Sequence, residues 1–237
     1  SMHMGAGTMA LAIDSAIEKA GRVAATLLQT DIEELSFDKG AFLTRKDQRS
    51  VSIIEVASAA RNSDVMPSLG ENGIDTFYKR EEAPFTFPNG CHAAEVEIDP
   101  DTGSLTLVNY VMVDDYGSLV NPALTEGQLH GGVVQGIGQA LEEFVAFDPE
   151  TGQLLSGSLM DYTAPRAASF PFFKAHFQGV PTEANLLGVK GVGQAGCIAA
   201  PQVITHAVLN ALQEYNIDHI QMPITSQSLW RSIQAAS

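Results

Sequence analysis

A glycine-rich run, LGVKGVGQAGCIAAP, occupies residues 187–201. Four glycines fall within the nine residues from Gly188 to Gly196. Each would cost about 1 kcal/mol relative to alanine inside a regular element, so the run is typical of backbone that passes close to something or needs a positive φ. Pro201 suits the first turn of a helix, and apolar residues recur behind it at helical spacing. We expect a loop that leads into a helix N-terminus, where free N–H groups favour an anionic or polar ligand, with Gln194 projecting from the loop.

Residues 191–196 also fit the dinucleotide-binding pattern G-x-G-x-x-G. That pattern is informative only after a strand, before a helix and inside a βαβ unit. Only a short apolar run precedes it here, and no alternation of strands and helices surrounds it. The sequence therefore disfavours a nicotinamide site, while a glycine turn with a purely structural role stays open.

The composition excludes several classes of protein. Of 237 residues, 45% are hydrophobic and 17% charged, and the net charge is −15. The acidic excess argues against nucleic-acid or anionic-membrane partners. The two cysteines, Cys91 and Cys197, do not make a disulfide framework. No apolar run reaches membrane-spanning length. The N-terminus lacks the pattern of a signal peptide. We expect a cytoplasmic protein whose low charge fraction indicates a surface covered by a partner chain or by more of the same polypeptide.

A second glycine-rich segment covers residues 121–141. Asn121 is a good N-cap and Pro122 a good first helical residue, so we predict a helix. Its glycines stand at positions 127, 131, 132, 136 and 138. Glycines four residues apart leave one helix face nearly bare. A bare face admits a neighbouring helix or a flat ligand, and the pattern alone does not choose between them.

The other segments alternate between helical and strand patterns. Helices are predicted over 8–29, 52–61 and 201–213 and from about Ser226; strands over 32–37, 41–44, 92–99, 105–113, 143–147 and 153–158; and a loop over 62–73. The turn at 99–103 recurs nearly unchanged at 148–152. These elements predict an α+β fold with two lobes of mixed sheet and packed helices.

The side chains exclude most common catalytic sites. None of the six histidines has metal-ligand spacing, and there is no nucleophile elbow, Walker loop or Cys-x-x-Cys. Asp114 and Asp115 are adjacent in a strand, point to opposite faces and make a poor acid–base pair. No metal held by side chains is predicted. Two glycine-rich elements with exposed glutamines remain, and they suit a polar, planar, phosphorylated ligand.

Three stretches, residues 4–28, 127–141 and 188–212, together resemble the molybdenum-binding subunit of the xanthine dehydrogenase, aldehyde oxidoreductase and carbon monoxide dehydrogenase family. The resemblance covers essentially the whole chain. It implies one domain, residues 1–237, that is the C-terminal molybdopterin-binding domain of such a subunit. It also implies a molybdenum held by a pterin dithiolene, as molybdopterin or molybdopterin cytosine dinucleotide, rather than by side chains.

The resemblance assigns residues and partners as well. Gln128 would hydrogen-bond the cofactor near the metal, and Gly131, on the same predicted helix, would also contact the cofactor. A loop at Met4–Thr8, with Met4 and Gly5, and the backbone around Gly193 would line the pterin and its phosphate end. The implied partners are the upstream molybdopterin-binding domain of the same subunit and subunits that carry 2Fe-2S clusters and FAD, in an oligomeric complex.

The catalytic position departs from the family. A glutamate of this loop normally acts as the base that prepares a water-derived oxygen for attack on an electron-poor carbon, and Gln194 takes its place here. A neutral amide cannot act as a general base, and loss of a positioned base costs about 10²–10⁴-fold. His130, where relatives often carry an acid, is a second departure; we favour a helix-face histidine in a packed interface.

Three interpretations of Gln194 follow. The protein uses another base with a water oriented by Gln194, it acts on a substrate that needs no strong base, or it is a cofactor-binding paralogue with little activity. We expect the molybdopterin-binding portion of a molybdenum hydroxylase that oxidises an aldehyde, an N-heterocycle or a small carbon substrate with water-derived oxygen. The alternative is a cofactor-binding or assembly subunit with weak or no catalysis. The isolated chain is expected to hold no molybdenum.

Overall fold

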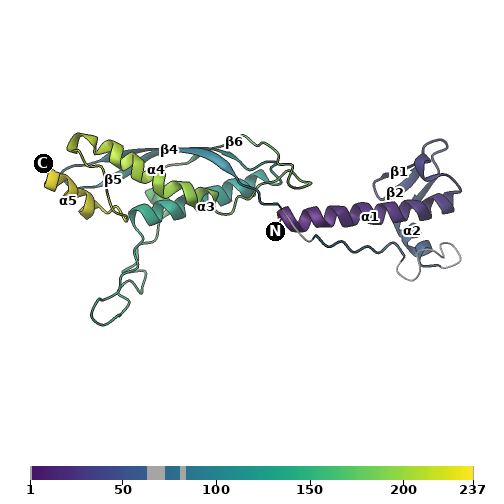
Figure 1. Cartoon of the computed structure of the whole chain (residues 1–237), viewed down its shortest axis with the longest axis horizontal. Coiled ribbons are helices and arrows are strands. Elements are labelled where there is room, and N and C mark those ends of the chain that lie inside the picture. The colour runs from purple at the N-terminus through teal and green to yellow at the C-terminus, as the bar shows by residue number, and fades with distance from the viewer. Residues whose placement is uncertain (1, 63–72, 81–83, 237) are drawn as a thin grey trace. The chain divides into compact units, whose positions relative to one another are not determined.

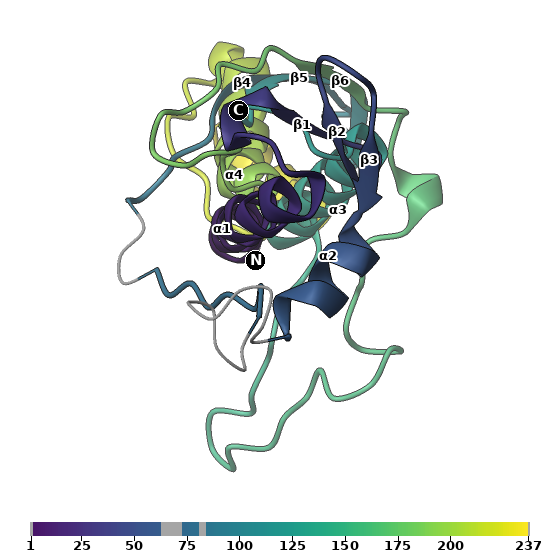
Figure 2. The ribbon, with the colours of Figure 1, turned by 90° about the vertical axis from the view of Figure 1, so that its right-hand side faces the viewer.

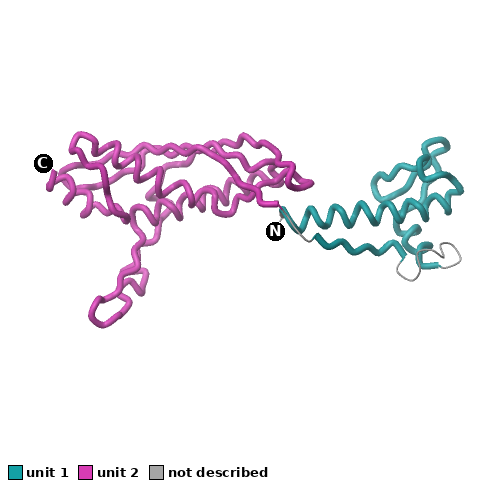
Figure 3. Tube along the Cα trace, viewed as in Figure 1, with its two compact units in different colours: residues 1–83 teal, residues 84–237 magenta. Residues whose placement is uncertain are grey.

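The computed structural model describes residues 2–62, 73–80 and 84–236. The chain divides into two compact units, Ser1–Ala83 and Pro84–Ser237 (Figure 3). Each unit has its own three-stranded sheet and its own helices, which confirms the predicted α+β fold. None of the described helices is both long enough and apolar enough to cross a bilayer. Most of the loop predicted over 62–73 lies outside the described residues.

The first unit is built around one long helix. Its elements are α1 (Met2–Leu28), η1 (Ile32–Glu34), β1 (Leu35–Asp38), β2 (Ala41–Thr44), β3 (Ser50–Ser52) and α2 (Ile53–Ala60). The strands form an antiparallel sheet in the order β1-β2-β3, and Figure 2 shows them side by side. Ser52 and Glu55 form a capping box that starts α2. The core joins α1, the sheet and α2 through Ala20, Val23, Ala24, Leu28, Leu35, Phe42, Val56 and Ala60.

The predicted loop at Met4–Thr8 is wrong, because α1 begins at Met2 and includes these residues. Methionine and alanine are good helix formers, and no proline interrupts them. The Thr8 hydroxyl donates to the Met4 carbonyl at 2.7 Å, a bond between successive turns of the helix. Gly5 and Gly7 lower the helix propensity here without ending the helix.

The second unit contains a mixed sheet. It consists of β4 (Asn89–Ile98), β5 (Leu105–Asp115) and β6 (Lys174–Phe177); β4 and β5 are antiparallel, and β5 and β6 are parallel. The predicted turn at 99–103 joins β4 to β5, with Gly103 at φ 69° and its N–H bonded to the Asp99 carbonyl at 2.7 Å. A bulge at Glu95/Val96 shifts the register. Beyond the bulge, Tyr110, Met112 and Asp114 are buried.

Two glycine-containing helices pack beneath this sheet (Figure 1). They are α3 (Pro122–Leu141) and α4 (Ala195–Ala211); η3 (Ala167–Ser169), η4 (Gln213–Tyr215) and α5 (Ser226–Ala236) complete the unit. The Asn121 side chain caps α3, as predicted, by accepting from the Leu124 N–H at 3.1 Å. The core lies between helices and sheet and includes Tyr110, Met112, Leu129, Val133, Ile137, Ile204, Val208 and Leu229.

Two predicted elements differ from the structure. The helix predicted from Pro201 begins at Ala195, so Pro201 lies in its interior. Bare backbone at Gly136 makes room for it, because a methyl group added there would lie 2.9 Å from Pro201 Cδ. The hairpin predicted over 143–158 is reduced to one bridge between Phe147 and Leu154. Among the described residues no further strand pairs with this segment, and an isolated hairpin is marginally stable in water.

Candidate functional site

The glycine-rich loop is fixed to the sheet at its beginning. Val189 forms an antiparallel bridge with Gly117, directly after the end of β5. The Ser118 N–H donates to the Gly188 carbonyl, and the Lys190 N–H donates to the Tyr116 carbonyl, both at 2.9 Å. These bonds place residues 188–190 as a short extra ladder beside the sheet, so the position of the following loop is set by β5.

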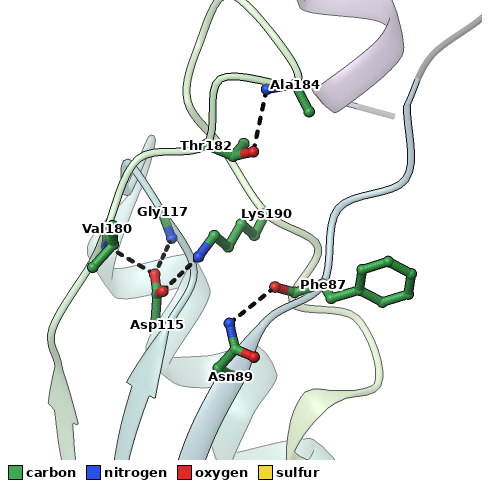
Figure 4. A network of polar contacts seen from close by, with 8 residues as sticks. All are labelled: Phe87, Asn89, Asp115, Gly117, Val180, Thr182, Ala184 and Lys190. Carbon is green, nitrogen blue, oxygen red and sulfur yellow. Dashed lines mark hydrogen bonds and ion pairs between the residues drawn. The ribbon is translucent and has the colours of Figure 1, made fainter.

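One carboxylate ties three segments together at this point (Figure 4). Asp115 accepts hydrogen bonds from the Lys190 ammonium, from the Gly117 N–H at 2.8 Å and from the Val180 N–H at 2.9 Å. Burial alone would raise the pKa of Asp115, but these bonds and the Lys190 charge outweigh it and lower the pKa to about 2. Asp115 is therefore ionised at neutral pH and anchors the loop.

A buried amide shapes the segment just before the loop. Asn185 donates from its side chain to the Val189 carbonyl at 2.9 Å and accepts from the Val189 N–H at 3.1 Å. Gly188, at φ 64°, lies between them and donates its N–H to the Asn185 carbonyl. The loop is thus rigidly held up to Lys190.

The middle of the loop has free backbone donors. The N–H groups of Gly191, Val192 and Gly193 have no acceptor among the described residues. A methyl group added at Gly191 or Gly193 would meet nothing within 4 Å. α4 starts at Ala195, directly after this loop, so the positive end of its dipole lies next to these donors. Free N–H donors beside a helix N-terminus suit an anionic or polar ligand.

Gln194 stands between this loop and α4. It is the N-cap residue, with φ −118° and ψ 3°, but its side chain makes no capping hydrogen bond. Its carbonyl accepts from the Ile198 N–H at 3.1 Å, which begins the helix. The exposed amide is therefore available to a ligand as both donor and acceptor.

The two predicted glutamine elements meet directly. The Gln128 side-chain amide, on α3, donates to the Gly193 carbonyl at 2.8 Å. Gln128 therefore lies beside the residue that precedes Gln194, although 65 residues separate it from Gly193. A methyl group added at Gly127 or Gly131, on the same part of α3, would meet nothing within 4 Å.

A different set of glycines lies in the contact between α3 and α4 and leaves no room for a side chain. A methyl group added at Gly196 would lie 2.6 Å from the Leu129 carbonyl oxygen, and one at Gly136 would lie 2.8 Å from Ala200 Cβ. One at Gly132 would lie 3.2 Å from the Cys197 nitrogen. Of the two possibilities left open by the sequence, helix packing is confirmed for Gly132 and Gly136, while approach of a flat ligand to the open glycines stays a prediction.

The remaining predicted site residues lie elsewhere. Met4 and Gly5 belong to α1 in the first unit, in helical conformation, and their contact with the cofactor stays a prediction. His130 packs edge-on against Phe172 and Phe173, with ring centroids 6.2 and 5.6 Å apart. That environment matches the packed-interface interpretation. Among the described residues, no group of three or more His, Cys, Asp or Glu side chains is arranged to hold a metal ion.

The sequence analysis missed one buried polar cluster. His92 Nε2 lies 3.1 and 3.2 Å from the two Asp114 carboxylate oxygens, and His92 Nδ1 lies 3.0 Å from the Tyr110 hydroxyl. Counted back from the turn at 99–103 without interruption, the register pairs His92 with Val111 and puts Asp114 on the other face. The bulge at Glu95/Val96 instead pairs His92 with Met112, which makes Asp114 its diagonal neighbour on the same face.

The sequence matches the family model for the molybdopterin cofactor-binding domain over residues 1–171. It is 29% identical to the carbon monoxide dehydrogenase large chain of Hydrogenophaga pseudoflava over 99% of this chain and 29% of that relative. It is 34% identical to the nicotine 6-hydroxylase large subunit of Paenarthrobacter nicotinovorans over 91% of this chain and 26% of that relative. The chain thus spans well under a third of the length of these relatives.

Solved structures agree with these matches. A Cu,Mo-CO dehydrogenase structure in its carbon monoxide reduced state superposes with a TM-score of 0.86 and 27% identity, covering 100% of this chain and 29% of that one. Quinoline 2-oxidoreductase from Pseudomonas putida 86 superposes with a TM-score of 0.77 and 31% identity, covering 92% of this chain and 28% of that one.

Proposed function

Because this chain belongs to the molybdopterin cofactor-binding domain family, we propose that it is the C-terminal cofactor-binding part of the large subunit of a molybdenum hydroxylase. The hydrogen bond from Gln128 to the Gly193 carbonyl supports this proposal most directly. It joins two open, glycine-rich elements into one surface of amide donors next to a helix N-terminus. A large, polar, anionic and partly planar ligand suits such a surface.

Each residue of this surface has a role in the proposal. Gln128 holds the loop and hydrogen-bonds the cofactor, while Gly131 lets it approach α3 closely. The N–H groups around Gly193 receive its phosphate or pterin edge, and contacts of Met4 and Gly5 with the cofactor belong to the same proposal. The cofactor is molybdopterin or its cytosine dinucleotide, and when bound it supplies two-electron redox chemistry.

Gln194 faces the reacting groups in this proposal. Its amide holds a water molecule or a substrate carbonyl in position but does not remove a proton. The proposed substrates are aldehydes, N-heterocycles or small carbon compounds, to which water-derived oxygen is added. Two relatives carry names of this kind, a nicotine 6-hydroxylase and a carbon monoxide dehydrogenase large chain.

The proposed assembly is larger than this chain. It includes an upstream molybdopterin-binding domain of the same subunit and partner subunits with 2Fe-2S clusters and FAD, in an oligomeric cytoplasmic complex. The matched relatives are described as large subunits or chains, which is consistent with such an assembly. The second candidate function is a cofactor-binding or assembly subunit with little catalysis, which the presence of Gln194 at the catalytic position favours.

The test is made on the complete enzyme. Its molybdenum and pterin content is measured first, and oxidation of nicotine, quinoline and carbon monoxide is then assayed with and without Gln194→Glu. A positioned base contributes about 10²–10⁴-fold, and we expect Gln194→Glu to raise turnover of one substrate at least about tenfold. Bound cofactor with unchanged turnover would favour the assembly role, and absence of cofactor would refute the proposal. The chain 1–237 alone is expected to contain no molybdenum by elemental analysis.

A further inference from the structure

A cavity lies beneath the first turns of α4. Its volume is about 200 Å³. It is lined from the strand side by Asn89, His92 and Asp114 and from the helix side by Ala195, Ile198 and Ala199. We name it the first-turn cavity. Ala195, which directly follows Gln194 in the chain, lines this cavity, so the cavity begins one residue away from Gln194.

The polar end of this cavity is a buried pair. The side chains of His92 and Asp114 are 2% and 4% exposed. An ionised Asp114 can only accept, so His92 Nε2 carries the hydrogen and Nδ1 accepts from the Tyr110 hydroxyl. Burial and the Asp114 charge raise the pKa of Tyr110, which keeps its hydroxyl as a neutral donor. Asp114 lines the cavity, and its two carboxylate oxygens can accept hydrogen bonds besides the one from His92.

The size of the cavity favours water as its occupant. Pockets for drug-sized ligands measure about 300–1,000 Å³, whereas a water molecule occupies about 30 Å³ in the liquid. Several waters therefore fit in the first-turn cavity. They find polar partners in the Asn89 amide and the Asp114 carboxylate, as buried waters require. A side chain at position 90 would obstruct this arrangement, because a methyl group added at Gly90 would overlap the Asp114 carboxylate.

We propose that Asp114, supported by His92, accepts through water in the first-turn cavity the proton that Gln194 cannot take. This inference rests on the proposed hydroxylase function. Adding oxygen from one water to a carbon–hydrogen bond releases two protons and two electrons. The two electrons and the proton of the carbon–hydrogen bond would be taken up by the molybdenum cofactor, which supplies two-electron redox chemistry when bound. One proton leaves the attacking water as its O–H bond breaks, moves to a cavity water, and that water gives a proton to an Asp114 oxygen, which forms the new O–H bond.

The neighbouring acid cannot replace Asp114 in this role. Asp115 already accepts from Lys190, Gly117 and Val180, and its pKa is lowered to about 2. A group with so low a pKa is a poor proton acceptor at neutral pH. Asp114 is therefore a proton-accepting residue that acts through water, while Asp115 anchors the loop.

The decisive experiment compares Asp114→Asn in two backgrounds of the complete, cofactor-loaded enzyme. In the natural background we expect turnover to fall at least tenfold. In the background of Gln194→Glu, where the loop supplies its own base, we expect the same substitution to change turnover less than twofold. A merely structural role for Asp114 would lower turnover equally in both backgrounds, and that result would overturn the inference.

A second variant leaves the buried pair intact. Ala199→Leu fills the first-turn cavity and should lower turnover in the same background-dependent way as Asp114→Asn. Ala207→Leu, at another half-buried position of α4 outside the cavity lining, serves as its control. Full turnover with Ala199→Leu would contradict the water path even if Asp114→Asn failed to fold.

A spectroscopic readout separates protonation from activity. Substrate is added under anaerobic conditions, and infrared difference spectra are recorded between the enzyme with substrate and the enzyme without it. The carbonyl stretch of a protonated carboxyl should develop in the natural enzyme and be missing in Asp114→Asn with the same molybdenum content. If the carbonyl band is unchanged in Asp114→Asn, the role of Asp114 is refuted but the proposed function is not. If the complete enzyme contains no molybdenum, the proposed function itself is refuted.

Discussion

Seven glycines of α3, the loop and α4 fall into two groups that look alike in sequence. Gly132, Gly136 and Gly196 are closed, because an added methyl group would press on the facing helix. Gly127, Gly131, Gly191 and Gly193 are open, because an added methyl group would meet nothing within 4 Å. The same residue type thus serves helix packing on one side and, in our proposal, cofactor approach on the other. Substitutions in the two groups should have opposite consequences.

The largest effect on stability is expected at the closed group. In Gly196→Ala the new methyl group would lie 2.6 Å from the Leu129 oxygen and 2.7 Å from the Val133 nitrogen, and both are backbone atoms that cannot move aside. We expect a loss of about 3 kcal/mol in the free energy of unfolding. Urea unfolding followed by fluorescence of Trp230, the single tryptophan, reports on this unit. A loss below about 0.5 kcal/mol would show that the helix contact is looser than described.

The anchored end of the loop should show the next largest effect. Asp115→Asn removes the carboxylate that accepts from Lys190, Gly117 and Val180. We expect a loss of about 1–3 kcal/mol, typical of hydrogen bonds to a charged group, and faster amide hydrogen exchange at Lys190. Asp101→Asn, at an exposed turn position, is the control. Equal free energies of unfolding for the two variants would contradict the role of Asp115 as the anchor of the loop.

Acid should weaken the same anchor. The pKa of Asp115 is lower in the folded chain, at about 2, than the ordinary aspartate value of about 3.9. Its contribution is therefore present above about pH 4 and is lost as the pH falls toward 2. The stability difference between the natural chain and Asp115→Asn should shrink over this range. A difference that stays constant from pH 5 to about pH 2 would contradict the lowered pKa.

The smallest effect, and one of opposite sign, is expected at the open group. Gly131→Ala places a better helix former at an exposed position with free space around it. We expect a gain of about 0.5–1 kcal/mol in the isolated chain. Gly132→Ala is the matched neighbour, because its methyl group would lie 3.2 Å from the Cys197 nitrogen, and it should not gain. Equal responses would erase the distinction between the two groups.

Local patterns predicted much of this fold. Asn121 and Pro122 mark the start of α3, and the turn at 99–103 marks the hairpin, because caps and turns depend on neighbouring residues alone. The family resemblance assigned Gln128 and Gly193 to the cofactor; the structure places the Gln128 amide 2.8 Å from the Gly193 carbonyl, and their contact with the cofactor stays a prediction.

Other features depended on tertiary contacts. Pro201 was predicted to start a helix, but it lies in the interior of α4, where it packs beside the bare backbone of Gly136 on the facing helix. Which glycines are closed was likewise invisible, since the four-residue spacing is the same on both sides of α3. The pairing of His92 with Asp114 required the register of β4 on β5, which the bulge at Glu95/Val96 alters beyond that point.

The most direct test of the central claim, that the open glycines face the cofactor, is the molybdenum and pterin content of the complete enzyme carrying Gly131→Leu. Leucine is a good helix former and has free space at this position, so the fold should be retained. We predict that the purified variant keeps its melting temperature and loses most of its cofactor. Full cofactor occupancy in a folded variant would contradict the claim.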